Sequence, residues 1–200
     1  AFYLLMFSML TAKLNAQTTI NVDQLGGITT ATPFLLIVPD ARAGAMGDVG
    51  VATTADGNSL FHNPAKIAFG SRQVYFAVNY APWLRNLTDD IFIGGASYIN
   101  RYSDNNAWGV DFKYFSLGQI ELTDNSGNST GIINPNELAI SGTYALKLSP
   151  SFSMGVSLKY IRSNLSFTNA VSTLQPINSF GVDISGFYQS SEKDYGTFDG

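Results

Sequence analysis

The sequence predicts an all-β fold, a transmembrane antiparallel up-and-down β-barrel, and three observations lead to that prediction. Six stretches alternate apolar and polar residues with a period of two, which is typical of strands whose two faces meet different surroundings. Only 13% of the 200 residues are charged, well below the ~25% of an ordinary soluble domain. After the first dozen residues no run of ~18 apolar residues occurs, so the spanning elements cannot be helices, and a closed barrel is the alternative in lipid.

Residues 1–16 are expected to be the remnant of a secretory signal peptide. Ala1 to Leu10 form a short apolar block, and a small residue, Ala16, precedes the expected cleavage point at Gln17. A short buried helix or strand is the alternative, but the block has no polar face. The segment therefore indicates export.

Residues 17–72 are expected to form a compact plug, or hatch, inside the barrel. Small residues in this segment allow close approach of the backbone, and Asn63-Pro64 is a turn signal. A flexible periplasmic leader is the alternative, which the apolar run 35–38 argues against. The residues that define the plug motif are Arg42, Gly44, Met46, Gly47, Asp48, Asn63, Pro64 and Lys66.

Residues 73–200 are expected to be the first part of the barrel wall. The alternation predicts strands near residues 74–80, 91–99, 107–114, 137–148, 152–160 and 179–189, with the large apolar side chains facing outward. The inward positions carry small and charged residues, among them Asp111, Lys113, Lys147, Lys159 and Asp183. This pattern predicts a polar lumen, with Arg42 and Asp48 of the plug as ion-pair partners of the wall.

The lengths of the connections predict the orientation of the strands. Short links near residues 100–105 and 149–151 are typical of periplasmic turns, and the longer loops that contain Trp83, Gly127 and Asn169 are typical of the external side. Six strands are too few for a single-chain barrel, which needs about eight. We therefore expect the remaining strands to lie outside this sequence rather than in further copies of it.

Four sequence blocks, at residues 39–53, 63–66, 80–84 and 114–118, carry a family resemblance. The turn at Asn63-Pro64-Ala65, placed just before the first strand, resembles that of the FadL-like outer-membrane proteins, which hold an amino-terminal hatch. Taken in order, the four blocks resemble the PorV family of the type IX secretion system of Bacteroidetes, over about residues 34–166. The resemblance implies a barrel of about fourteen strands when complete, of which this chain supplies about six.

The resemblance also implies a location in the outer membrane and a role in protein escort. Members of this family associate with the translocon barrel SprA (Sov), take up secreted cargo through its conserved carboxy-terminal domain, and pass it to an attachment complex that contains PorU. No catalytic residue, metal or cofactor is expected, and the net charge of −4 argues against nucleic acid. Outer-membrane lipid is expected around the wall.

Two external loops supply the candidate contacts for the translocon or the cargo. Trp83 and Leu84 lie in the first loop, where Trp83 is either an apolar anchor or an aromatic residue of the membrane interface. The loop 123–130 is rich in Asn, Ser, Thr and Gly, and can offer backbone edges and adaptable hydrogen bonds to a β-rich domain. Its candidate residues are Asp124, Asn125 and Asn128.

Two other functions compete with protein escort. A lipopolysaccharide O-deacylase needs a nucleophile and a base, but the only histidine is His62, which we expect to be hydrogen bonded locally, and no Gly-x-Ser-x-Gly motif occurs. A FadL-like transporter of hydrophobic compounds needs an apolar pocket, which the charged lumen disfavours. Calcium at the oxygen-rich segments 104–106 and 124–128 is less expected than ordinary turns.

Overall fold

The computed structural model describes residues 32–82, 90–123, 126–165, 168–169, 172–173 and 176–190. Four short helices come first: η1 (Pro33–Leu36), α2 (Ala41–Ala45), α3 (Ser59–His62) and η2 (Pro64–Phe69). The strands are β1 (Val74–Pro82), β2 (Ile91–Asn100), β3 (Asn106–Leu117), β4 (Ile120–Thr123), β5 (Ser129–Ile133), β6 (Asn136–Ser149), β7 (Phe152–Asn164), β8 (Thr168–Asn169), β9 (Ser172–Thr173) and β10 (Ile177–Tyr188). The expected signal-peptide remnant, residues 1–16, lies outside the described residues.

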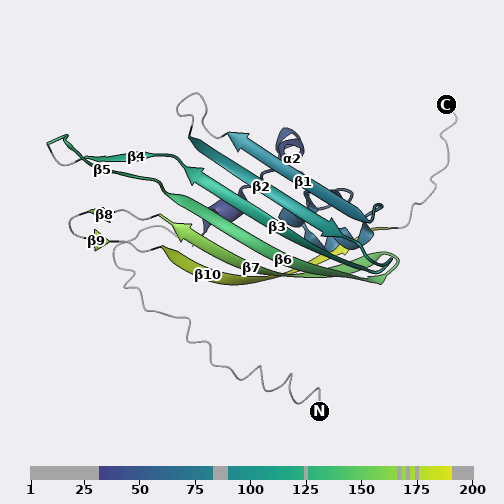
Figure 1. Ribbon diagram of the computed structural model, residues 1–200. Helices are drawn as coiled ribbons and strands as arrows, with labels where there is room; N and C mark the ends of the chain where they lie inside the picture. The colour runs from purple at the N-terminus through teal and green to yellow at the C-terminus, as the bar shows by residue number, and fades with distance from the viewer. Residues whose placement is uncertain are drawn as a thin grey trace, which may run out of the picture. The chain divides into compact units, whose positions relative to one another are not determined.

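Six long strands form one antiparallel sheet in the order β1-β2-β3-β6-β7-β10 (Figure 1). Each long strand pairs with the next long strand along the chain, so the sheet is an up-and-down meander, as the sequence predicts. The connections differ from the prediction, because residues 116–136 contain the two-stranded ribbon β4–β5 and residues 163–177 contain β8–β9. Gly127, with a φ of 83°, supplies the turn of the first ribbon.

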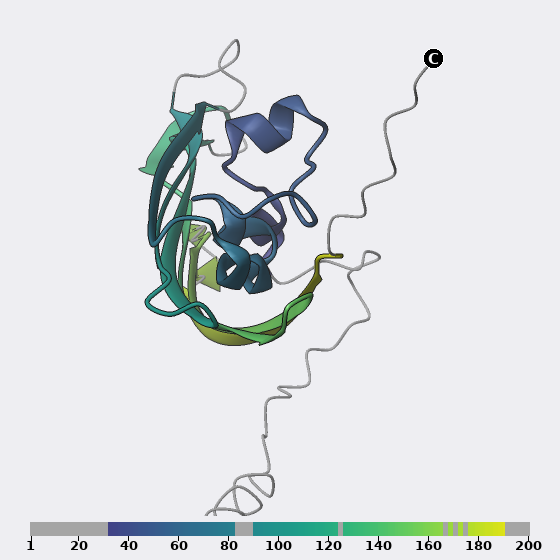
Figure 2. The same cartoon turned by 90° about the vertical axis from the view of Figure 1, so that its right-hand side faces the viewer.

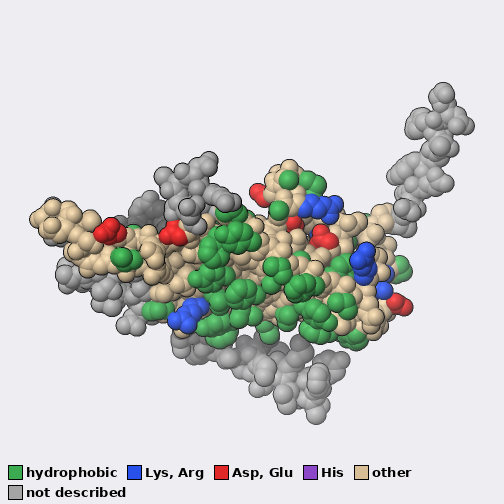
Figure 3. All heavy atoms as spheres, turned by 45° about the horizontal axis from the view of Figure 1, so that its top comes forward, with side chains coloured by type: hydrophobic (Ala, Val, Ile, Leu, Met, Phe, Trp, Pro, Cys, Tyr) green, Lys and Arg blue, Asp and Glu red, His purple; other side chains and the backbone are tan. Residues whose placement is uncertain are grey.

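The two faces of the sheet differ as the period-two pattern predicts. Outward side chains are large, apolar and exposed, with Phe76 at 70% and Phe180 at 82% of full exposure. The hydrophobic side chains gather in a band over the strands (Figure 3). Most buried inward side chains are small or polar, as for Ala107 and Ser153 at 0% and Lys113 at 5%, and a few, such as Ile99, are large and apolar. This is the inside-out arrangement of a β-barrel wall.

The concave face of the sheet is covered by residues 32–70, which we call the packed segment (Figure 2). Leu60 and Ile67 of this segment lie in one apolar cluster with Ile99 of β2 and two small residues of the wall, Ala107 and Ala145. Phe34 forms a second cluster with wall residues of β6 and β7. The core therefore lies between the packed segment and the sheet, and no helix among the described residues is long and apolar enough to cross a membrane.

Candidate functional site

The Asn-Pro-Ala motif joins the packed segment to the last strand of the sheet. The Asn63 side-chain oxygen accepts a hydrogen bond from the Ala65 N–H at 3.1 Å, which caps η2, and Pro64 begins that helix with its φ already fixed. The Asn63 amide nitrogen donates to the carbonyl of Val51 at 3.3 Å and to that of Gly186 in β10 at 3.1 Å. One side chain therefore holds a helix, a loop and the wall together.

Small wall residues let the packed segment approach the sheet closely. Ser153 of β7 donates to the carbonyl of Ala65 at 2.7 Å. A Cβ added at the neighbouring inward position, Gly155, would lie 3.1 Å from the Ala65 nitrogen, and one at Gly109 would lie 2.9 Å from the Leu60 side chain. Glycine at these inward positions therefore makes room for the packed segment.

Lys66, which follows the Asn-Pro-Ala motif, is completely buried. Its Nζ donates to the carbonyl of Gly50 at 2.6 Å and to the hydroxyl of Thr53 at 3.0 Å. Burial lowers the pKa of Lys66, although the charges of Asp56 and Asp40 act to raise it. Lys66 holds the loop at residues 50–53 against η2. In the described structure its hydrogen bonds therefore join two parts of the packed segment.

Asp40 and His62 form a second buried pair inside the packed segment. The Asp40 side chain accepts hydrogen bonds from the backbone N–H groups of Arg42 at 3.0 Å and Ala43 at 3.2 Å, which caps α2, and it lies 3.2 Å from the His62 Nε2. Burial acts to raise the pKa of Asp40, but these hydrogen bonds outweigh it and lower the pKa. His62 is thus a hydrogen-bonded residue of the packed segment, as predicted, with its ring packed against Gly50.

A lysine of the wall holds the beginning of the packed segment. Lys113 of β3 donates from its Nζ to the carbonyl of Leu35 at 3.0 Å and to that of Ile37 at 2.8 Å. Phe34, next to this contact, is 1% exposed and packs beside Ala139 of β6. An ammonium group satisfies the two carbonyls that the short η1 helix leaves at its end.

The predicted ion pair between Arg42 and the wall is wrong, and none between Asp48 and the wall is found among the described residues. Arg42 lies on the exposed side of α2 and pairs with Asp56 of the same segment at 3.7 Å. Over the described ranges, no ion pair joins the packed segment to the wall. The wall's contact with the segment instead uses Lys113 and backbone carbonyls, which need no charged partner in the segment.

The glycines of the plug motif have different roles from one another. Gly47, with a φ of 78°, and Asp48, with a φ of 61°, form a left-handed turn after Met46, which caps the end of α2 and is exposed. A Cβ at Gly44 would meet open space, so close packing does not explain that residue. At Gly50, by contrast, a Cβ would overlap the His62 ring, and close approach is required.

We call the end of the sheet where β3 ends and β6 begins the loop end. It carries the β4–β5 ribbon, which extends past the ends of β3 and β6 (Figure 1). Asn128 lies in its exposed turn, Ile132 is 62% exposed, and the Thr130 hydroxyl donates to the carbonyl of Leu122 at 3.0 Å across the ribbon. The other candidate contact residues, Trp83, Leu84, Asp124 and Asn125, lie outside the described residues.

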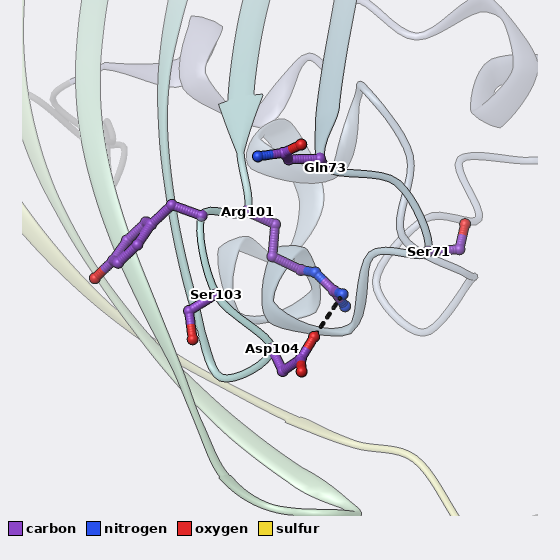
Figure 4. A pocket seen from close by; sticks show the side chains of 6 residues that line it. Ser71, Gln73, Arg101, Ser103 and Asp104 are labelled. Atoms are coloured by element: carbon purple, nitrogen blue, oxygen red, sulfur yellow. Dashed lines mark hydrogen bonds and ion pairs between the residues drawn. The ribbon is translucent and has the colours of Figure 1, made fainter.

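The turn end of the sheet has a polar hollow of about 560 Å³ (Figure 4). It is lined by Ser71, Gln73, Arg101, Tyr102, Ser103 and Asp104. The Arg101 guanidinium donates to the carbonyl of Gly70 at 2.6 Å and pairs with Asp104 at 3.3 Å, so it ties the end of the packed segment to the β2–β3 turn. In the part of the chain that the structure describes, no cluster of three His, Cys, Asp or Glu side chains could hold a metal ion.

Several residues of this site were not predicted from the sequence. The contacts of Lys113 with the carbonyls of the packed segment and of Ser153 with Ala65 join positions 76 to 88 residues apart. The sequence did contain one signal for these contacts: in strands that otherwise alternate regularly between apolar and polar residues, the inward positions 109 and 155 are glycines. Such a glycine indicates that another backbone approaches the strand closely.

One comparison with known proteins identifies a family. A family model described as type IX secretion system protein PorV matches residues 20–200. A search of curated proteins finds no match. The matched range includes the packed segment and the six long strands of the sheet.

Proposed function

The chain belongs to the PorV family and is a component of the type IX secretion system, where we propose that it escorts secreted proteins at the outer membrane. In this proposal the chain binds the SprA (Sov) translocon barrel and takes up cargo through the cargo's conserved carboxy-terminal domain. It then passes the cargo to a PorU-type attachment complex. The proposed role is binding and transfer, without a chemical step.

The two-faced sheet supports the proposed membrane placement. Large apolar side chains such as Phe76, Leu158 and Phe180 are exposed on its convex face, where lipid would cover them. The packed segment occupies the concave face, and this position supports the proposal that it is part of a plug, for which the sequence leads us to expect residues 17–72. A wall built in this way leaves its loop end as the surface available to a secreted partner.

The β4–β5 ribbon is the observation that carries the escort proposal. Within the described ranges, each of its strands pairs only with the other, so both outer edges have backbone groups available to a further strand. The β5 strand is exposed over residues 129–132 and includes the apolar side chain of Ile132. An edge of this kind, with an apolar side chain beside it, suits a β-rich domain that adds a strand.

Shortening the ribbon tests the proposal. Ile120 and Ile133 are register partners, so an Asn-Gly turn in place of residues 121–132 can join them as a two-residue hairpin. We expect capture of a purified cargo carboxy-terminal domain by the full chain to weaken by roughly tenfold or more, because strand addition is lost. Capture is measured by pull-down, and assembly is checked by heat-dependent mobility on gels.

A pair of point variants provides the matched control. Ile132→Asp places a charge on the ribbon, and Tyr102→Asp places one at an exposed aromatic residue of the opposite, turn end of the sheet. Only the first is expected to weaken capture. Full capture by a shortened ribbon in an assembled wall would remove the ribbon from the cargo site.

A further inference from the structure

A second hollow lies on the outward face of the wall, at the loop end. Its volume is about 320 Å³, within the range of sites for small ligands. The residues that matter for its chemistry are Tyr80, Asp90, Phe92, Tyr114, Gln119 and Asn136. They come from β1, β2, β3, β6 and the connections at the loop end, and none belongs to the packed segment or to β5.

Next to the hollow, one outward position of β2 has no side chain. Gly94 of β2 is the register partner of both Tyr80 in β1 and Tyr114 in β3, so a gap separates the two tyrosines. A Cβ at Gly94 would meet only a backbone oxygen, at 3.8 Å. Phe92 lies beside this gap, with its ring centroid 5.3 Å from that of Tyr80 and 5.9 Å from that of Tyr114. The floor of the hollow is therefore a row of three aromatic rings.

The described rim of the hollow is polar. Gln119 and Asn136 contribute amides, Ser116 a hydroxyl and Asp90 a carboxylate whose Oδ2 accepts the Gln119 N–H at 2.6 Å. No Lys or Arg is found among the described residues that line it. Phosphate binding relies on such cations, whereas amide, hydroxyl and carboxylate groups match the many donors and acceptors of a sugar.

We propose that this hollow binds the sugar headgroup of a glycolipid in the leaflet at the loop end. The aromatic row offers an apolar platform for the C–H face of a sugar ring, and the rim offers hydrogen-bond partners for its hydroxyls. Below the hollow, the outward face continues with Ala96 and its register partners Val78 and Phe112, along which acyl chains lie. The site goes beyond the escort role and rests only on the membrane placement proposed for the convex face.

The test uses the full chain in nanodiscs that contain equal amounts of a monoglucosyl diacylglycerol and a phosphatidylethanolamine with the same acyl chains. Native mass spectrometry measures which lipid the released protein retains. We expect the glucolipid to be enriched by about tenfold, the preference that one or two hydrogen bonds confer. Gly94→Leu places a side chain between Tyr80 and Tyr114, where it disturbs the row of three rings, and should abolish the enrichment. Gly142→Leu, at an open outward position of β6 that does not line the hollow, should leave it unchanged.

Further arms of the experiment separate the alternatives. Tyr114→Leu removes one ring and should reduce the enrichment even if Gly94→Leu fails to assemble. Equal retention of both lipids, enrichment of phosphatidylethanolamine, or full enrichment in Gly94→Leu would each overturn the proposed site. Displacement by free glucose would assign the hollow to a soluble sugar and overturn the lipid assignment. A wild-type chain that does not enter nanodiscs would overturn the membrane placement itself, a failure distinct from insertion without enrichment.

Discussion

The concave and convex faces of the same six strands solve opposite packing problems. On the concave face, Ser153 and Gly155 of β7 lie against the packed segment, Ser157 shares a hydrogen bond with Thr143 of β6, and the two serines are almost completely buried. On the convex face of the same strand, Val156 and Leu158 are 46% and 64% exposed. In a soluble sheet the larger apolar residues would be the buried ones.

This difference shows that each face of the sheet sets its own requirements for the size and the polarity of its side chains. Inward positions such as Gly155 are small because another backbone approaches them, and Ser153 is polar because it binds a carbonyl group of that backbone, at Ala65. The outward positions are large and apolar because no protein element among the described residues covers them. The same strand therefore has a polar concave face and an apolar convex face.

The largest predicted effect comes from reversing the convex face. Leu158 lies at the middle of β7, and Leu158→Arg places a charge where the wall is proposed to meet the centre of the bilayer. We expect the free energy of unfolding in lipid vesicles to fall by about 2–4 kcal/mol. Urea titration of the vesicle-inserted chain measures it, with Leu158→Ile as the matched apolar variant. An arginine without effect would show that this face does not meet lipid.

A smaller effect is expected from enlarging the concave face. Gly155→Val forces a side chain against the backbone of Ala65, which cannot move without shifting η2, and should lower the free energy of unfolding by about 1–3 kcal/mol. Gly142→Val is the matched control, because a Cβ at that outward position meets open space. Proteolysis of residues 41–62 should be faster only in Gly155→Val. Equal behaviour of the two variants would mean that the packed segment does not depend on this contact.

The sequence was sufficient for the six long strands and for the two-faced pattern, because a wall between two surroundings imposes a period of two over many residues. The ribbon β4–β5 was missed because strands of four and five residues are too short to establish alternation. Their Asn-, Ser- and Gly-rich turn instead resembled an ordinary loop. Short strands become visible only when their pairing is known.

The candidate site was predictable in its motif and not in its contacts. Asn63 and Pro64 were identified from turn chemistry, and the structure gives them the related role of a helix cap. The sequence analysis gave Arg42 a partner in the wall, but the structure pairs it with Asp56 of the packed segment. The error arose because charge alone does not indicate the side of α2 on which a residue lies. Lys113 binds carbonyls of Leu35 and Ile37, and this contact depends on how strand and segment are aligned in space.

The smallest predicted effect concerns pH and the packed segment. The pKa of Asp40 is lowered in the folded chain, so at acidic pH the unfolded chain binds the proton first and stability falls as pH decreases. The contribution of Asp40 is therefore complete above the ordinary carboxyl pKa of about 4 and is lost as pH falls through the lower folded value. Hydrogen exchange of residues 41–48, corrected for intrinsic rates, should show weaker protection on acidification from pH 6 to pH 2.5. Asp40→Asn should remove that dependence, whereas Asp48→Asn, at an exposed position of the same segment, should retain it. An unchanged dependence in Asp40→Asn would assign the acid response to other carboxyls, either Asp56, which pairs with Arg42 in the packed segment, or those of the wall.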